Sequence, residues 1–159
     1  MFLKPDYNLK SIYEIDLNEL KSNGINAMLF DLDSTIMASK TAFYDDKTIE
    51  WLNKVRKDFF IGVVSNNHNK KYMERVMKVT DFPIVFEAAK PDTKVAKKFM
   101  DEHNLTGEHT AFVGDRPLTD TLCGKRLGCT TILVDSISAD KEHPIVRFAR
   151  KLERLTVSG

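Results

Sequence analysis

The sequence contains little cysteine, no long apolar run and almost no net charge. Its only cysteines, Cys123 and Cys129, have no Cys or His nearby at metal-ligand spacing. This pattern favours two buried, reduced thiols in a cytosolic protein and argues against a catalytic cysteine. The first residues lack the apolar stretch of a signal peptide, and no segment approaches the roughly 18 consecutive apolar residues of a membrane span. We therefore expect a cytoplasmic protein, with peripheral contact to a membrane surface as the alternative.

The chain also lacks the features of a multidomain or nucleic-acid-binding protein. It has no Ser- or Pro-rich linker, no internal repeat and no low-complexity tract. A net charge of +1 and the absence of a basic stripe argue against nucleic acid as a partner. With 159 residues, of which 42% are apolar and 30% charged, the sequence suits one globular domain over 1–159.

Short apolar runs alternate with helical patterns along the chain. The runs cover residues 27–31, 59–65, 84–88, 110–114 and 130–135, and each has the length of a buried parallel strand. Segments with apolar spacings of three and four lie between them. Strands separated by helices imply right-handed crossovers. The sequence therefore predicts an α/β fold, a doubly wound, three-layer, Rossmann-like parallel sheet, with terminal helices at about 8–22 and 143–155.

Two aspartates separated by one leucine follow the first apolar run. Side chains alternate along a strand, so Asp31 and Asp33 should point the same way, about 6–7 Å apart. Two carboxylates in one small volume repel each other, and a hard divalent cation such as Mg²⁺ would reconcile them. A solvated acidic turn explains the pair equally well when it is taken alone.

Polar residues follow the other apolar runs too. They are Ser65 and Asn66 after the second run, Lys90 after the third, and Asp115, Thr119 and Asp120 after the fourth. Singly, each has an ordinary explanation as a helix cap, a turn or a solvated side chain. Ligands bind beyond the carboxyl ends of parallel strands, so their occurrence at successive strand ends predicts one site.

Such a set meets the needs of phosphoryl transfer, which are a nucleophile, a proton source, donors around the phosphoryl group and a cation. We expect Asp31 to attack phosphorus and carry an aspartyl-phosphate, and Asp33 to act as general acid and base. Ser65 would donate a hydrogen bond to a phosphoryl oxygen, and Lys90 would place its charge against the same group. Asp115 would complete a Mg²⁺ site with the Asp31 carboxylate and the Asp33 backbone carbonyl.

Four further residues belong to the predicted site. Asp120 would either reach the metal through a water molecule or orient the lysine, and Asn66 would bind phosphate beside the serine. Thr35 and Thr119 are expected to support the carboxylates. Helix N-termini after the serine and the lysine would add amide donors to the anion.

The order of these residues resembles the four motifs of the haloacid dehalogenase (HAD) superfamily. The matching stretches are Asp31-x-Asp33-x-Thr35, Ser65 after an apolar run, Lys90, and Gly114-Asp115-x-x-x-Thr119-Asp120. The likeness is to the capless subclass IIIA phosphatases, similar to the phosphatidylglycerophosphate phosphatase-like group. It implies Mg²⁺-dependent phosphatase activity, with Asp31 as nucleophile and Asp33 as acid and base. Ser34 stands where asparagine is commoner in this group.

The motif spacing leaves no room for a cap domain. Between Asp33 and Ser65 there is space only for a flap over 34–46 and one helix, and between Ser65 and Lys90 only for one helix and a strand. An open site favours phosphate on a large carrier, or a homo-oligomer in which a neighbouring subunit supplies the lid. The resemblance and the basic, amphipathic segment 143–155 make a phospholipid head group a reasonable substrate, although a helix that packs on the sheet explains that segment equally.

Two other functions remain open. A nucleic-acid end phosphatase would use the same motifs, but the chain has no basic stripe. A phosphorylation-responsive receiver module also combines acids, a hydroxyl and a lysine on an α/β sheet. Its phosphoacceptor follows a later strand, whereas here the acid pair ends the first predicted strand.

Overall fold

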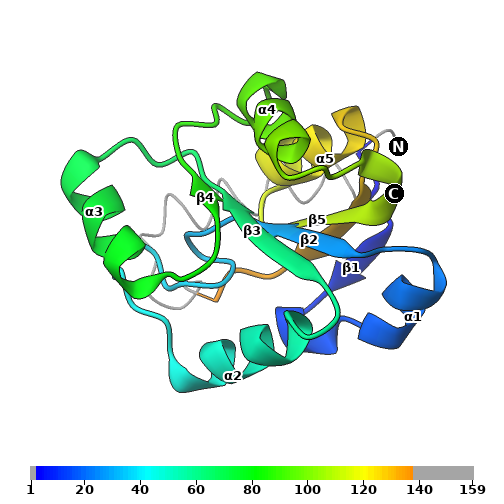
Figure 1. Cartoon of the computed structure of the whole chain (residues 1–159), viewed down its shortest axis with the longest axis horizontal. Helices are drawn as coiled ribbons and strands as arrows, with labels where there is room; N and C mark the ends of the chain where they lie inside the picture. The colour runs from blue at the N-terminus through cyan, green and yellow to red at the C-terminus, as the bar shows by residue number, and fades with distance from the viewer. Residues whose placement is uncertain (1–2, 138–159) are drawn as a thin grey trace.

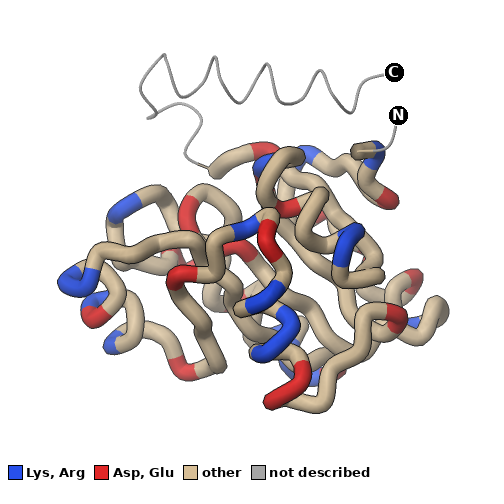
Figure 2. Tube along the Cα trace, turned by 90° about the horizontal axis from the view of Figure 1, so that it is seen from above, with Lys and Arg blue, Asp and Glu red and all other residues tan. Residues whose placement is uncertain are grey.

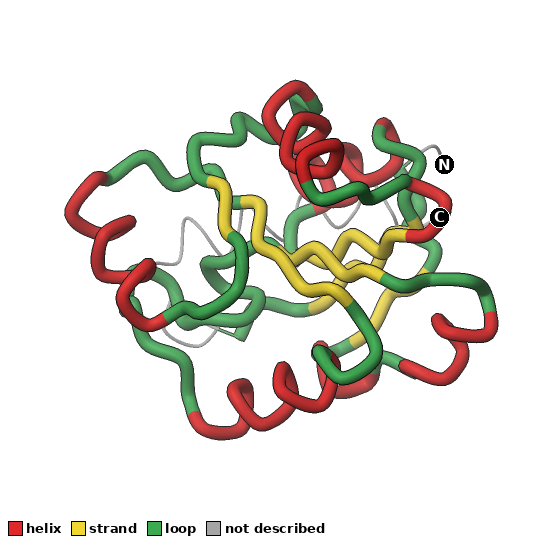
Figure 3. The backbone as a smooth tube through the Cα atoms, in the orientation of Figure 1, coloured by secondary structure: helices red, strands yellow, loops and turns green. Residues whose placement is uncertain are grey.

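The computed structural model describes residues 3–137, which form one six-stranded parallel sheet between helices (Figures 1 and 3). The strands run in the order β1-β6-β5-β2-β3-β4. They are Tyr7–Leu9 (β1), Ala27–Phe30 (β2), Phe60–Val64 (β3), Ile84–Val85 (β4), Thr110–Gly114 (β5) and Thr130–Val134 (β6). Each predicted apolar run forms a strand, and β2 and β5 are buried along their whole length because both faces are covered. The predicted α/β fold is confirmed.

Helices cover both faces of the sheet. They are α1 (Leu17–Ser22), α2 (Asp46–Val55), α3 (Lys70–Val79), α4 (Lys94–Glu102) and α5 (Leu122–Arg126), with short turns η1 (Ile12–Glu14), η2 (Gly107–His109) and η3 (Pro117–Thr121, a π-helical turn). One apolar cluster packs the sheet against α1, α2 and α3, and a second packs it against α4 and α5. Figure 1 shows α1 and α2 on one side of the sheet and α4 and α5 on the other. These are the three predicted layers.

The N-terminal segment differs from the predicted helix over 8–22. It contains β1, η1 and a shorter helix, α1, whose N-cap is Asp16; its side chain accepts a hydrogen bond from the Glu19 amide. Strand β1 pairs with β6, and Asp6 secures this edge because its carboxylate accepts from the backbone N–H of Thr131 at 2.8 Å. A three-residue edge strand has too little pattern to be recognised in a sequence.

This extra strand corrects one argument about function. The acid pair follows β2, the second strand of the chain, and not the first as predicted. Strand order therefore no longer separates this chain from a receiver module. The predicted helix over 143–155 lies outside the described residues.

The two helices that follow Ser65 and Lys90 begin several residues after them. Helix α3 begins at Lys70, five positions after Ser65, and α4 begins at Lys94 rather than directly after Lys90. Loops therefore follow both residues, and no helix N-terminus adjoins them. Two glycines in the left-handed region end helices, since Gly24 follows α1 with φ +84° and Gly128 follows α5 with φ +76°.

The flap connects β2 to α2 and stays short, because Asp45 already caps α2 by accepting from the Thr48 amide at 2.8 Å. Only the flap and α2 separate Asp33 from Ser65, and only α3 and β4 separate Ser65 from Lys90. No cap domain is inserted at either place in the chain. Among residues 3–137, no helix is both long and apolar enough to cross a membrane.

Candidate active site

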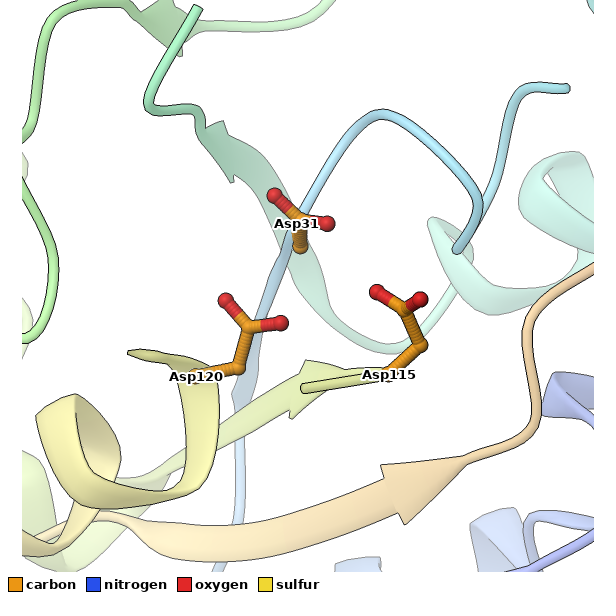
Figure 4. Close-up of side chains that lie close together, drawn as sticks. All are labelled: Asp31, Asp115 and Asp120. Atoms are coloured by element: carbon orange, nitrogen blue, oxygen red, sulfur yellow. The ribbon is translucent and has the colours of Figure 1, made fainter. Parts of the chain in front are cut away.

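Three aspartates converge beyond the carboxyl ends of neighbouring strands. Asp31 follows β2, Asp115 follows β5, and Asp120 lies on η3; each offers one carboxylate oxygen, and these oxygens lie within 4.8 Å of one another. Figure 4 shows the three side chains pointing toward a common volume. The Thr35 hydroxyl lies 3.4 Å from Asp31 Oδ2 and 3.2 Å from Asp115 Oδ1, so it links two of them. The parallel register of β2 and β5 brings the aspartates together.

Lys90 supplies the positive charge of this cluster. Its Nζ lies 2.9 Å from Asp31 Oδ1 and 2.8 Å from Asp120 Oδ1, and its side chain is 1% exposed. Burial alone would lower the pKa of Lys90, but the two carboxylates outweigh it and raise that pKa well above its ordinary value. Of the two predicted tasks for Asp120, contact with the lysine is therefore the one the structure contains.

Asp120 has an unusual charge environment for a carboxylate paired with lysine. Burial and the nearby Asp31 carboxylate raise the pKa of Asp120 to about 6, although Lys90 and the Arg116 amide act to lower it. The Arg116 N–H donates to Asp120 Oδ2 at 3.2 Å. The cluster thus places three carboxyl groups beside one ammonium group.

Gly114 makes room for Asp120. A Cβ at position 114 would lie 2.3 Å from the Asp120 Cγ, closer than any contact between real side chains. Asp120 therefore rests directly against the glycine Cα, which places its carboxylate beside Lys90. Thr119 lies on the same π-helical turn and is half-buried.

Asn66 holds the backbone of Lys90. Its Oδ1 accepts from the Lys90 N–H at 2.7 Å, and its Nδ2 donates to the Lys90 carbonyl at 3.1 Å. The prediction assigned Asn66 to phosphate binding, whereas both polar atoms of its carboxamide serve the lysine. The Nδ2 group carries a second hydrogen, so phosphate binding by Asn66 stays a prediction.

Asp33 is held by groups that the sequence did not identify. The Tyr72 hydroxyl on α3 donates to Asp33 Oδ1 at 2.5 Å, and the Lys40 amide donates to the same oxygen at 3.2 Å. The Asn67 side chain lies 3.4 Å from Oδ2. Burial and the Asp33 contact raise the pKa of Tyr72 far above its ordinary value. A tyrosine at a buried position of an amphipathic helix is a sequence signal, because its hydroxyl needs a partner.

Ser65 is buried at the end of β3 and adjoins the same loop. Its Oγ accepts from the Asn67 N–H at 3.1 Å, so its own hydrogen remains for an acceptor elsewhere. Asn67 therefore contacts both residues: its backbone N–H donates to the Ser65 hydroxyl, and its side chain lies near Asp33 Oδ2.

The oxygen donors fit a hard divalent cation. Asp31, Asp115 and Asp120 could offer one carboxylate oxygen each, and oxygen is the donor that Mg²⁺ prefers. With Lys90 as the charge partner, two negative charges of the cluster remain for a metal ion to balance. The predicted metal set named Asp33 in place of Asp120. The Asp33 carboxylate faces Tyr72 and Asn67, so only the predicted role of its backbone carbonyl stands, as a prediction.

Comparison with known proteins identifies the broader group. A family model described as HAD-hydrolase-like matches residues 87–147. The probable phosphatase YqeG of Bacillus subtilis is 29% identical over 158 residues, which cover 99% of this chain and 91% of the relative. The chain is thus similar to HAD-type hydrolases. The resemblance predicted from the four motifs is thereby confirmed, and these relatives support a phosphoric monoester hydrolase.

Two further relatives extend the comparison of this HAD-like chain. The chloroplastic/mitochondrial phosphatidylglycerophosphate phosphatase 1 of Arabidopsis thaliana is 26% identical over 161 residues, which cover 96% of this chain and 46% of the relative. The chain thus spans about half the length of that protein. A HAD family enzyme from Bacteroides thetaiotaomicron, solved as a magnesium complex, superposes with a TM-score of 0.53 at 14% identity, covering 72% of this chain and 95% of the other. That likeness is one of fold.

Proposed function

We propose that this HAD-like chain is a Mg²⁺-dependent phosphomonoesterase that works through an aspartyl-phosphate on Asp31. The observation that carries the proposal is the position of Asp31 at the centre of the cluster. One of its oxygens contacts Lys90 at 2.9 Å and the other lies near Thr35 at 3.4 Å. At 16% exposure its side chain is more accessible than those of Lys90 and Asp120, as a nucleophile requires.

In the first half of the reaction, an Asp31 carboxylate oxygen attacks phosphorus. An Asp–O–P bond forms and the bond from phosphorus to the leaving oxygen breaks. The Asp33 carboxyl donates its proton to that oxygen, which departs as an alcohol. The Ser65 hydroxyl donates to a phosphoryl oxygen, and the Lys90 ammonium opposes the charge of the transferred group.

In the second half, water attacks the phosphorus of the aspartyl-phosphate. Asp33, now a carboxylate, accepts a proton from that water, and the Asp–O–P bond breaks. Inorganic phosphate leaves, and both aspartates return to their starting states. Asp31, Asp115 and the Asp33 backbone carbonyl would hold the metal ion, with Asp120 close by. Such an ion supplies neutralisation of charge on phosphoryl oxygens.

We infer a substrate in which the phosphate sits on a large carrier, with a phospholipid head group as the candidate. Two observations support this choice. No insertion closes over the site between the motifs, so a bulky carrier has access. A relative that spans 96% of this chain is named for phosphatidylglycerophosphate.

Replacement of the nucleophile tests the mechanism. Asp31→Asn should lower phosphate release from p-nitrophenyl phosphate by more than ~10³-fold, because the amide cannot form the covalent intermediate. Wild type should be active only with Mg²⁺, and acid-quenched protein should carry one phosphoryl group that the variant lacks. The assay measures phosphate release with and without EDTA, and mass spectrometry detects the phosphoryl group.

Asp101→Asn is the matched control, because the exposed side chain of this aspartate on α4 contacts only Lys97, in an i,i+4 ion pair, among the described side-chain contacts. It should retain wild-type activity. Undiminished turnover by Asp31→Asn would refute the covalent mechanism, and turnover unaffected by EDTA would refute the metal requirement.

A further inference from the structure

Tyr72 connects α3 to Asp33. The two residues are 39 positions apart in the chain, and the tyrosine hydroxyl lies 2.5 Å from Asp33 Oδ1. The side chain is buried, at 7% exposure, within the apolar cluster that packs α3 against the sheet. A phenylalanine would fill this apolar site equally well. The hydroxyl is therefore explained by its polar partner.

The two carboxylate oxygens of Asp33 have different hydrogen-bond partners. Oδ1 accepts from Tyr72 at 2.5 Å and from the Lys40 amide at 3.2 Å. Oδ2 has only the long 3.4 Å contact with Asn67 among the described residues. A carboxyl group that donates a proton must present an oxygen that is not already held by two donors. Oδ2 is that oxygen.

The same helix also holds the flap. The Tyr72 hydroxyl lies 3.4 Å from the Met37 sulfur, and the Arg75 guanidinium donates to the Thr41 carbonyl at 3.3 Å. At the end of α3, the hydroxyls of Tyr44 and Thr80 are 2.9 Å apart. Tyr72 differs from the other contacts because it alone among them reaches an acidic side chain.

We propose that Tyr72 is a positioning residue, whose hydroxyl holds Asp33 Oδ1 so that Oδ2 faces the leaving oxygen of the substrate. The proposal rests on the function proposed above, in which Asp33 protonates that oxygen. A substrate with a poor leaving group depends on this proton, whereas nitrophenolate departs readily without one. The role of Tyr72 should therefore depend on the leaving group.

Tyr72→Phe tests this role in the full-length protein. We expect kcat/KM for an alkyl phosphate, glycerol 3-phosphate, to fall about 10- to 100-fold, the factor for one hydrogen bond to a charged group. For p-nitrophenyl phosphate the loss should stay within about threefold. In an Asp33→Asn background, the same change should produce no further loss, because its target is already disabled.

Tyr44→Phe is the matched control. It also removes a hydroxyl that joins the flap region to α3, but its partner is Thr80 and not a carboxylate. It should change kcat/KM for both substrates by the same small factor. Thermal unfolding of each variant identifies any loss that comes from instability.

Equal losses on the two substrates with Tyr72→Phe would overturn the proposal, as would no loss on either. An additional loss in the Asp33→Asn background would overturn it as well. A wild-type protein that releases phosphate from neither substrate would instead refute the proposed function, and this inference with it.

Discussion

At the scale of single residues, Lys90 is the most constrained side chain of the site. An ammonium group at 1% exposure is stable only because two carboxylates lie beside it. Asn66 adds the second constraint, since its carboxamide binds both polar groups of the Lys90 backbone. Hydrogen bonds from Asn66 thus fix the Lys90 backbone, and the two carboxylates fix its ammonium group. Removal of that charge leaves the buried Asp120 without its partner.

Replacement of Lys90 should therefore destabilise the protein strongly. Lys90→Met should lower the free energy of unfolding by about 3–5 kcal/mol in metal-free buffer, the usual loss when one partner of a buried ion pair is removed. Urea denaturation at neutral pH measures this difference.

Lys97→Met provides the comparison. Lys97 and Asp101 form a 2.6 Å ion pair on the surface of α4, with side chains 62% and 60% exposed. Because solvent screens this pair, its loss should change the free energy of unfolding by less than about 1 kcal/mol. Similar losses for the two variants would contradict the view that Lys90 neutralises buried charge.

At the scale of elements, the site depends on close approach between β5 and the π-helical turn η3. Gly114 ends β5 and Asp120 lies on η3, and the two residues touch with no space for a Cβ. Backbone strain gathers around the same site. Of the six described non-glycine residues with positive φ, five lie in the flap or in the loop before Lys90: Ser34, Lys40, Ala42, Glu87 and Ala89. Ser34, at φ +70°, occupies a conformation that asparagine tolerates better than serine.

A side chain at position 114 should separate Asp120 from Lys90. Gly114→Ala should lower kcat at least about tenfold and the free energy of unfolding by about 1–3 kcal/mol, because the added methyl group forces η3 outward. Steady-state kinetics and urea denaturation measure the two effects.

Gly128→Ala is the control variant, which should lower stability without lowering activity. Nothing lies within 4 Å of a Cβ at this position, but its φ of +76° makes any side chain strained. We expect the free energy of unfolding to fall by about 1 kcal/mol with kcat unchanged. Gly128 precedes β6 and so lies at the amino ends of the strands, whereas the site lies at their carboxyl ends. If Gly114→Ala behaved in the same way, the contact with Asp120 would have no catalytic importance.

At the scale of the whole molecule, the described chain has no cap insertion between its motifs and no single-sign surface. Figure 2 shows basic and acidic positions interspersed over the described residues. The flap lies at the carboxyl edge of the sheet, and its Tyr44 and Met37 pack inward while Phe43 is 64% exposed. Phe43 is therefore the flap aromatic that is accessible to a substrate.

The open site leads to a prediction about substrate presentation. Phosphatidylglycerophosphate in vesicles should have a kcat/KM at least about tenfold higher than glycerol 3-phosphate, because remote parts of a large substrate contribute binding energy that a small one lacks. Phosphate release from both substrates, with Mg²⁺ present, measures the ratio.

A 3′-phosphorylated oligonucleotide is tested as the alternative substrate. The Asp31→Asn variant on the same vesicles gives the background rate of phosphate release. Preference for the oligonucleotide would favour a nucleic-acid end phosphatase. Equal rates on glycerol 3-phosphate and the lipid would exclude a contribution from the carrier.

Much of the fold and of the site could be predicted from the sequence alone. Five apolar runs became strands, and the polar residues after them were assigned to one edge because parallel strands bring their carboxyl ends together. The convergence of Asp31 and Asp115 follows from that rule. Short-range patterns determine these features, since strand length, alternation and motif order are all local.

The tertiary structure alone decided how the catalytic groups are held. Strand β1 has three residues and is defined by its partner β6 rather than by its own sequence. The contacts of Asn66 with Lys90 and of Tyr72 with Asp33 join residues 24 and 39 positions apart. Such contacts depend on how a loop folds back and how α3 packs on the sheet, and no local periodicity encodes a side-chain distance across two elements.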